Sequence, residues 1–357
     1  MVLEGIKSRL IIISLFNILF GFQALRVIAS APGKITLFGE HAIVYGYPAI
    51  VSSIDRRVYV RAETRGDDEV KIYAKDLRIP GVIVTYRHGE VIVETDYGKT
   101  LSAIAYIEKA LQITSRYLGT RKGVNLEVTS EMPVGAGLGT SAAVSVATIA
   151  AYAKVLGYEL GKEEIARLGW QVEKEVQGIA SPMDTSIASY GGFLKIIGRS
   201  GEYEISKVKV SESLPFVIGY VEREATTKDL VKKVKELRER YEVIIDEIMR
   251  IIGELTLRAE KALINNDLTT LGELMNINHG LLDALGVSNR KLNELVYAAR
   301  NAGALGSKLT GAGGGGCVIA LTPDKQEEVE VAMKLYATLT LKTKLGVEGV
   351  KVLVERP

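Results

Sequence analysis

Pro133-Val134-Gly135-Ala136-Gly137-Leu138-Gly139-Thr140-Ser141-Ala142-Ala143 is the stretch of this sequence that decides the fold. It lies between a strand-like run, Val124 to Thr129, and a small-residue run typical of a helix, Ala142 to Val155. Glycines at alternate positions let the backbone approach an anion closely. A helix that begins at Thr140 and Ser141, whose hydroxyls can cap its free amides, offers unpaired N–H groups and partial positive charge. The stretch therefore predicts a loop that binds nucleotide phosphates, which favours a kinase.

A glycine-rich turn before a helix is often only a tight connection between two elements. The glycines at 135, 137 and 139 fit neither of the two commonest nucleotide-binding patterns. GxxxxGK[ST] is absent, and the spacing does not give the dinucleotide pattern GxGxxG. What remains is a phosphate loop of another type, which the rest of the chain must identify.

Composition sets the limits of the interpretation. The chain has 357 residues, enough for two domains, and its 47% hydrophobic and 25% charged residues describe a globular protein. Its net charge of +2 gives no electrostatic reason to expect a nucleic-acid partner. The single cysteine excludes an intramolecular disulfide and fits a reducing cytoplasm.

Residues 1–24 form an extra N-terminal segment. Leu10 to Phe22 is mostly apolar and follows Lys7 and Arg9, like the basic start and apolar middle of a signal peptide. The run is short for a membrane span, which needs roughly 20 apolar residues. A start codon placed too far upstream, an additional docked helix and a weak membrane anchor all fit. The first is favoured, and no stable membrane association is expected.

The rest of the chain divides into two predicted domains. Residues 25–212 mix strands and helices around the phosphate loop. Residues 213–357 begin with an apolar strand, Pro215 to Tyr220, and continue through long helices and further strands as an α+β sandwich.

A second glycine-rich motif, Lys308-Leu309-Thr310-Gly311-Ala312-Gly313-Gly314-Gly315-Gly316-Cys317, joins two predicted strands. Each glycine costs roughly 0.5–1 kcal/mol relative to alanine, and a hairpin needs only one or two of them. The surplus indicates a backbone that packs closely against a ligand or against the first domain, rather than a loose surface loop. Cys317 enters a strand without a paired histidine, which favours packing over nucleophilic chemistry.

Two further motifs carry candidate polar groups. Lys34 begins a strand segment after Gly33, and Glu40 with His41 ends it, a plausible hydrogen-bonding pair for a polar ligand. His88 and His279 have no such company and are interpreted as structural.

Phosphoryl transfer needs oxygen ligands for Mg²⁺ and a group that accepts the proton of the attacking hydroxyl. Ser141 and Glu173 supply oxygens, with Glu175 as a competitor that spacing alone cannot exclude. Asp184, expected in an irregular loop with Pro182, is the candidate base. Lys34 beside it would stabilise the carboxylate.

Three motifs of this chain, in this order, resemble those of the kinases that phosphorylate galactose, homoserine, mevalonate and phosphomevalonate. The motifs are PGKITLFGEHAIVYGYPA, PVGAGLGTSAA and KLTGAGGGGC. The archaeal mevalonate kinases are the most similar branch. The resemblance extends from Leu25 to Val354 and leaves out only the N-terminal segment.

The resemblance implies an α+β fold with an N-terminal α/β domain that has a left-handed βαβ crossover, a ferredoxin-like C-terminal α/β sandwich, and an ATP cleft between them. It implies ATP, mevalonate and Mg²⁺ as ligands, and a homodimer in the cytoplasm. Its motif positions assign the roles as follows: base Asp184 with partner Lys34; metal ligands Ser141 and Glu173; ATP loop Pro133, Val134, Gly135, Ala136, Gly137, Leu138, Gly139, Thr140, Ser141, Ala142 and Ala143; substrate contacts Glu40, His41 and, more weakly, Thr227 and Lys228.

Three alternatives differ in observable ways. A phosphomevalonate kinase would need extra cationic residues for its substrate, and its first motif more often has Tyr where His41 stands. A galactokinase should carry an Asp-Tyr pair where Ile43-Val44 stands. A ligand sensor without catalysis should have lost its base or its metal ligands. This chain keeps all four of the candidate residues, Lys34, Ser141, Glu173 and Asp184.

Overall fold

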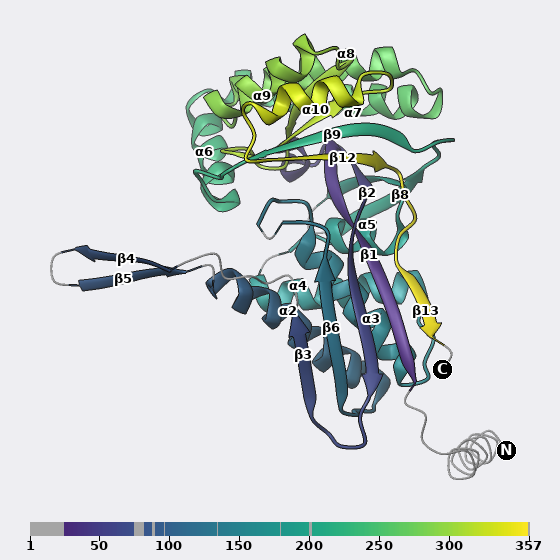
Figure 1. The fold of residues 1–357 in the computed structure, drawn as a ribbon. Helices are drawn as coiled ribbons and strands as arrows, with labels where there is room; N and C mark the ends of the chain where they lie inside the picture. Colours follow the sequence, from purple (N-terminus) through teal and green to yellow (C-terminus); the bar gives the residue numbers. More distant parts are fainter. Residues whose placement is uncertain are drawn as a thin grey trace.

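The computed structural model describes residues 25–74, 82–87, 90–95, 97–133, 135–178, 180–199 and 202–355. Two stacked parts are visible in Figure 1, with long strands and flanking helices below and a helix-covered sheet above. The predicted segment 1–24, His88 and Val134 of the phosphate loop lie outside the described residues. Among the residues described, no helix combines the length and the apolar character needed to cross a membrane.

The lower part is built on two long antiparallel strands, β1 (Arg26–Phe38) and β2 (Pro48–Thr64). The register between them shifts at Pro32/Lys34 and again at Thr36/Phe38, and such bulges re-aim side chains. Shorter strands extend the sheet on both sides: β3 (Val70–Ala74), β6 (Val124–Ser130), β7 (Phe193–Arg199), β8 (Glu202–Val208) and β13 (Lys351–Glu355). The hairpin of β4 (Val82–Arg87) and β5 (Glu90–Thr95) forms a separate two-stranded sheet.

Four helices pack in this part: α2 (Tyr97–Leu118), α3 (Thr140–Val155), α4 (Lys162–Gln177) and α5 (Met183–Tyr190). Helix α3 is buried along almost its whole length, because its alanine-rich sequence lets β1, β2, α2 and α4 approach from all sides. The parallel strands β3 and β6 are connected through α2, which makes a βαβ unit. The left-handed crossing of this unit stays a prediction.

The upper part has four antiparallel strands in the order β10-β11-β9-β12, formed by β9 (Leu214–Val221), β10 (Gly306–Thr310), β11 (Gly316–Leu321) and β12 (Leu339–Leu345). Its helices lie over one face of that sheet in Figure 1 and are α6 (Thr227–Arg240), α7 (Glu242–Ile264), α8 (Leu268–Ala284), α9 (Arg290–Asn301) and α10 (Gln326–Lys334). The sequence patterns did not predict β8 or β12, in which charged and hydroxyl residues interrupt the apolar signal.

The two parts share one sheet. Strand β12 meets β2 where Leu345 pairs with Ile54, and the last strand, β13, returns to pair with β1. The expected fold class, a two-part α+β protein, is confirmed, whereas the domain boundary at 212/213 stays a prediction. The junction between the parts brings the end of β1 close to the glycine-rich motif of β10 and β11.

Candidate functional site

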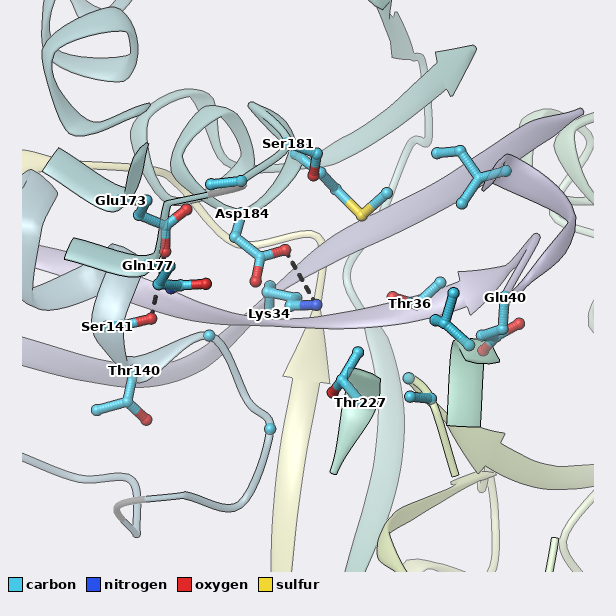
Figure 2. A pocket seen from close by; sticks show the side chains of 18 of the residues that line it. Lys34, Thr36, Glu40, Thr140, Ser141, Glu173, Gln177, Ser181, Asp184 and Thr227 are labelled. Atoms are coloured by element: carbon cyan, nitrogen blue, oxygen red, sulfur yellow. Dashed lines mark hydrogen bonds and ion pairs between the residues drawn. The ribbon is translucent and has the colours of Figure 1, made fainter. Parts of the chain in front are cut away.

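A cavity of roughly 760 Å³ opens where the two parts meet. It is lined by β1, the phosphate loop, α4 and α5 from the lower part, and by the start of α6 and the glycine run from the upper part. Figure 2 shows the side chains of this cavity. Four sequence-distant motifs therefore face one space.

The first group in the cavity is an ion pair. Lys34 Nζ lies 3.0 Å from Asp184 Oδ1, and the two side chains are 12% and 30% exposed. Figure 2 shows both groups pointing into the open space beside Thr227. A lysine held against a carboxylate stabilises the charged form of that carboxylate, which is the form that can accept a proton.

Asp184 lies in the first turn of α5, so the expectation of an irregular loop was wrong. Pro182 takes the N-cap position of this helix, and proline is well suited to helix starts because its missing N–H is not needed there. The helix fixes the direction of the Asp184 side chain more firmly than a loop would.

The phosphate loop has the backbone that its glycines predict. Gly135, Gly137 and Gly139 have positive φ values of 81°, 82° and 73°, a conformation that side chains disfavour. A Cβ on Gly139 would also lie 2.6 Å from Cγ of Lys34. The loop therefore packs directly over the lysine of the ion pair.

The helix after the loop is not capped as expected. Its N-cap residue is Gly139, and no side chain caps it, so the predicted role of the Thr140 and Ser141 hydroxyls was wrong. Ser141 Oγ instead donates to Glu173 Oε1 at 3.2 Å, while Thr140 Oγ1 is buried with no hydrogen-bond partner among the described residues. Because no side chain of the described residues caps the first amides of α3, these amides are available to a ligand.

Glu173 is buried on α4 and faces the same space as Asp184. Burial, and then the nearby charge of Asp184, raise the pKa of Glu173 to about 8. Glu175 instead pairs with Lys109 at 3.2 Å and does not line the cavity. The structure therefore favours Glu173 over Glu175 as the carboxylate of the site, a choice that sequence spacing left open. The Ser141–Glu173 pair is thus a set of oxygens that a cation would stabilise.

Glu40, His41 and Thr227 also line the cavity, and in Figure 2 Glu40 lies on the far side of the Lys34–Asp184 pair from Glu173. The Glu40 carboxylate is already occupied: it forms an ion pair with Lys308 of β10 and accepts a hydrogen bond from Asn278 Nδ2 at 3.3 Å. Lys308 and Glu40 are 0% and 1% exposed. Sequence analysis quoted Lys308 in a motif but missed this partner, because nothing in a linear pattern pairs residues so far apart.

His41 has a positive φ of 61°, which is uncommon outside glycine. Its Nε2–H donates to the carbonyl oxygen of Ala312 at 2.9 Å, which leaves Nδ1 as an acceptor. Burial lowers the pKa of His41, so the ring is neutral near pH 7. A neutral ring with a free acceptor nitrogen suits a ligand hydroxyl.

The glycine run packs against protein backbone. A Cβ on Gly313 would lie 2.1 Å from the carbonyl oxygen of Val287, and one on Gly315 would lie 2.3 Å from that of Glu222. Both neighbours belong to the upper part, while Ala312 reaches His41 of the lower part. Burial raises the pKa of the Cys317 thiol to about 12, in agreement with a packing role.

Sequence analysis also missed Arg223, which follows β9. Its guanidinium lies between the two glycine-rich loops, close to Gly137 and Gly316, and lines the cavity. Arg223 Nε is buried without a hydrogen-bond partner in the described structure. A guanidinium that lines the cavity beside the phosphate loop can bind an anionic ligand.

Comparison with known proteins places the chain among small-molecule kinases, in agreement with the phosphate loop and the ion pair of the cavity. The family pattern described as GHMP kinases N terminal domain matches residues 105–192, and GHMP kinases C terminal matches residues 259–339. A galactokinase galactose-binding signature matches residues 14–64. The mevalonate kinase of Pyrococcus abyssi is 48% identical over 331 residues, 91% of this chain and 97% of that protein. The chain belongs to the GHMP kinase family.

Other relatives of this GHMP kinase agree. The mevalonate kinase of Methanothermobacter thermautotrophicus is 39% identical and covers 85% of this chain and 93% of its own length. The structure of L. major mevalonate kinase in complex with R-mevalonate has a TM-score of 0.79 at 26% identity, over 90% of this chain and 96% of that one. The Methanococcus jannaschii mevalonate kinase structure has a TM-score of 0.71 at 30% identity, over 92% and 96%.

Proposed function

We propose that this GHMP kinase transfers the γ-phosphate of ATP to the primary hydroxyl of (R)-mevalonate and so forms 5-phosphomevalonate for isoprenoid synthesis. The observation that carries the proposal is the convergence of the phosphate loop, the Lys34–Asp184 pair and the Ser141–Glu173 pair on one cavity. The identity with archaeal mevalonate kinases supports mevalonate as the acceptor. The chain is an ATP-dependent small-molecule kinase.

In this proposal Asp184 accepts the proton of the attacking hydroxyl. Lys34 pairs with this carboxylate and stabilises the developing alkoxide. Residues 133–143 bind the ATP phosphates through backbone N–H groups, including those of the first turn of α3. Arg223, which contacts the same loop, supplies a further positive charge for an anionic group.

Ser141 and Glu173 would hold Mg²⁺. The fit rests on the buried Glu173 carboxylate, whose raised pKa reports a negative charge without enough compensation. The ion would supply positive charge that neutralises the charge developing on the phosphates during transfer. Ser141 orients the carboxylate through its hydrogen bond.

In this proposal His41 offers Nδ1 to a hydroxyl of mevalonate, and Thr227 offers its own hydroxyl from the start of α6. Glu40, also expected to contact substrate, lies at the same wall with its carboxylate held by Lys308 and Asn278. We propose that Glu40 contributes mainly by fixing the position of His41, its neighbour in the chain.

A coupled assay of ADP release with mevalonate, phosphomevalonate, galactose and homoserine tests the proposal. We expect turnover with mevalonate at least tenfold faster than with any other acceptor. Faster turnover with phosphomevalonate would reassign the substrate, and ATP binding without ADP release for all four would favour the ligand sensor. We also propose a cytoplasmic homodimer.

A further inference from the structure

The last strand, β13, forms an open edge of the sheet. It pairs with β1 on one side and stands at one end of the strand order. Within the described part of the chain, no strand pairs with its other side, and Figure 1 shows it at the margin of the lower part. An edge strand presents a row of unpaired N–H and C=O groups that can pair with another strand.

This edge differs from the other edges of the described sheet in its side chains. Strand β3, which pairs only with β6, exposes Val70 and Tyr73, but Lys71 and the half-buried Ile72 separate them. Every residue of β10, at the opposite end of the strand order, is buried beneath helices. Strand β8 is exposed but carries charges along its length. In β13, by contrast, Val352, Leu353 and Val354 are consecutive and are 36%, 66% and 44% exposed. Three exposed apolar residues on an edge strand are typical of a surface that binds another strand.

The sequence of β13 is complementary to its own reverse. It reads Lys351-Val352-Leu353-Val354-Glu355. In an antiparallel pair of two copies centred on Leu353, Lys351 of each copy faces Glu355 of the other, and Val352 faces Val354. A shift of two residues in either direction places a charge opposite Leu353. A shift of one residue sets positions whose backbone groups point outward opposite positions whose backbone groups point back to β1, so the hydrogen bonds of the pair are lost.

We propose that two copies of this chain associate through β13 and extend the sheet across a two-fold axis. Such an interface uses the same patch on both copies, and backbone hydrogen bonds hold it. Lys351 and Glu355 now pair with Glu348 at 3.0 Å and Arg61 at 2.9 Å. These pairs are half-exposed and worth little, so they compete weakly with the pairs across the axis.

The interface leaves the cavity open, because no residue of β13 lines it. The proposal therefore does not depend on the substrate of the kinase. Turnover per chain serves as a check that each variant is folded.

Sedimentation velocity of the full chain over a wide range of concentration measures the association. We expect a species of twice the 38.8 kDa chain mass that dissociates on dilution. Lys351→Glu and Glu355→Lys each place like charges opposite one another, so each should weaken association by about tenfold. The double variant restores opposite charges and should restore the dimer. Glu202→Lys, on the exposed strand β8, is the matched control and should change nothing.

Three results would overturn the proposal. One is a single-chain mass at every concentration. Another is a dimer that neither single variant weakens, and the third is a double variant no better than the singles. A chain that begins at residue 25 is measured in parallel. If it dimerises while the full chain does not, residues 1–24 cover the edge, and the proposal fails for the full chain.

Discussion

Two lysine–carboxylate pairs lie at the junction of the two parts, and they differ in what surrounds them. Lys34 and Asp184 are partly exposed to the cavity, and Glu173 lies close enough to interact with Asp184. Lys308 and Glu40 form a sealed pair, meaning that both side chains are fully buried, and Asn278 donates a further hydrogen bond to the carboxylate. The same two functional groups thus occur once facing the ligand space and once buried in its wall.

The comparison shows that burial, rather than residue type, distinguishes an ion pair with a proposed catalytic role from one with a structural role. An ion pair that faces a cavity can exchange its partner for a substrate hydroxyl. A fully buried pair cannot, and its value lies in fixing β1 against β10. The hydrogen bonds between Thr36 and Thr310, and between His41 and Ala312, reinforce the same seam.

The largest expected effect concerns the open pair. Asp184→Asn removes the proton acceptor while keeping the shape of the side chain. Turnover should fall by about 10²–10⁴-fold, as loss of a general base does. The coupled ADP-release assay measures turnover, and calorimetry measures ATP binding, which should be kept.

Glu175→Gln is the matched control, because this carboxylate lies on the same stretch of helix as Glu173 but outside the cavity. Its turnover should stay within twofold of the unmodified chain. If Asp184→Asn kept nearly full turnover, the open pair would have no chemical role and the comparison would fail.

The next effect concerns the sealed pair. Lys308→Met leaves the Glu40 carboxylate buried without its counter-charge. The free energy of unfolding should fall by about 3–5 kcal/mol, since breaking a buried pair leaves an uncompensated charge. Chemical denaturation measures this loss.

Lys34→Met is the control from the open pair, and its loss of unfolding free energy should be about 1 kcal/mol or less. The double variant Lys308→Met with Glu40→Gln should recover much of the loss, because no charge then remains buried. Equal losses for Lys308→Met and Lys34→Met would show that burial does not distinguish the two pairs.

The open pair was predictable from sequence and the sealed one was not. Lys34 and Asp184 belong to motifs whose residue types have a chemical purpose, so the resemblance named them as partners. Lys308 and Glu40 were each quoted, but their pairing depends on how β10 docks against β1, which no local pattern encodes. Arg223 was missed for the same reason, since only the folded chain places it between two loops.

Secondary structure followed a similar rule. Long helices such as α7 and α9 fall where the sequence predicted a series of long helices after Pro215–Tyr220, because one apolar face repeats along each of them. Helix α5 was missed, since its eight residues are too few to show a period and most of them are buried. The helix that carries the candidate base was therefore the hardest to see.

The smallest expected effect tests the sealed region through pH. His279 lies beside Lys308; its Nδ1 accepts from the backbone N–H of Leu309 at 3.4 Å, and its Nε2–H donates to Asn293 Oδ1. Burial, and then the charge of Arg300, lower the pKa of His279 to about 4. The ring stays neutral in the folded chain at pH values where the unfolded chain binds a proton. As pH falls from about 6.5 towards 4, this group should remove about 1.4 kcal/mol of unfolding free energy per pH unit.

His279→Gln should remove that part of the slope, which the difference between two denaturation series measures. Because carboxylates titrate in both series, only the difference reports the histidine, and parallel slopes would mean that water reaches this side of the seam.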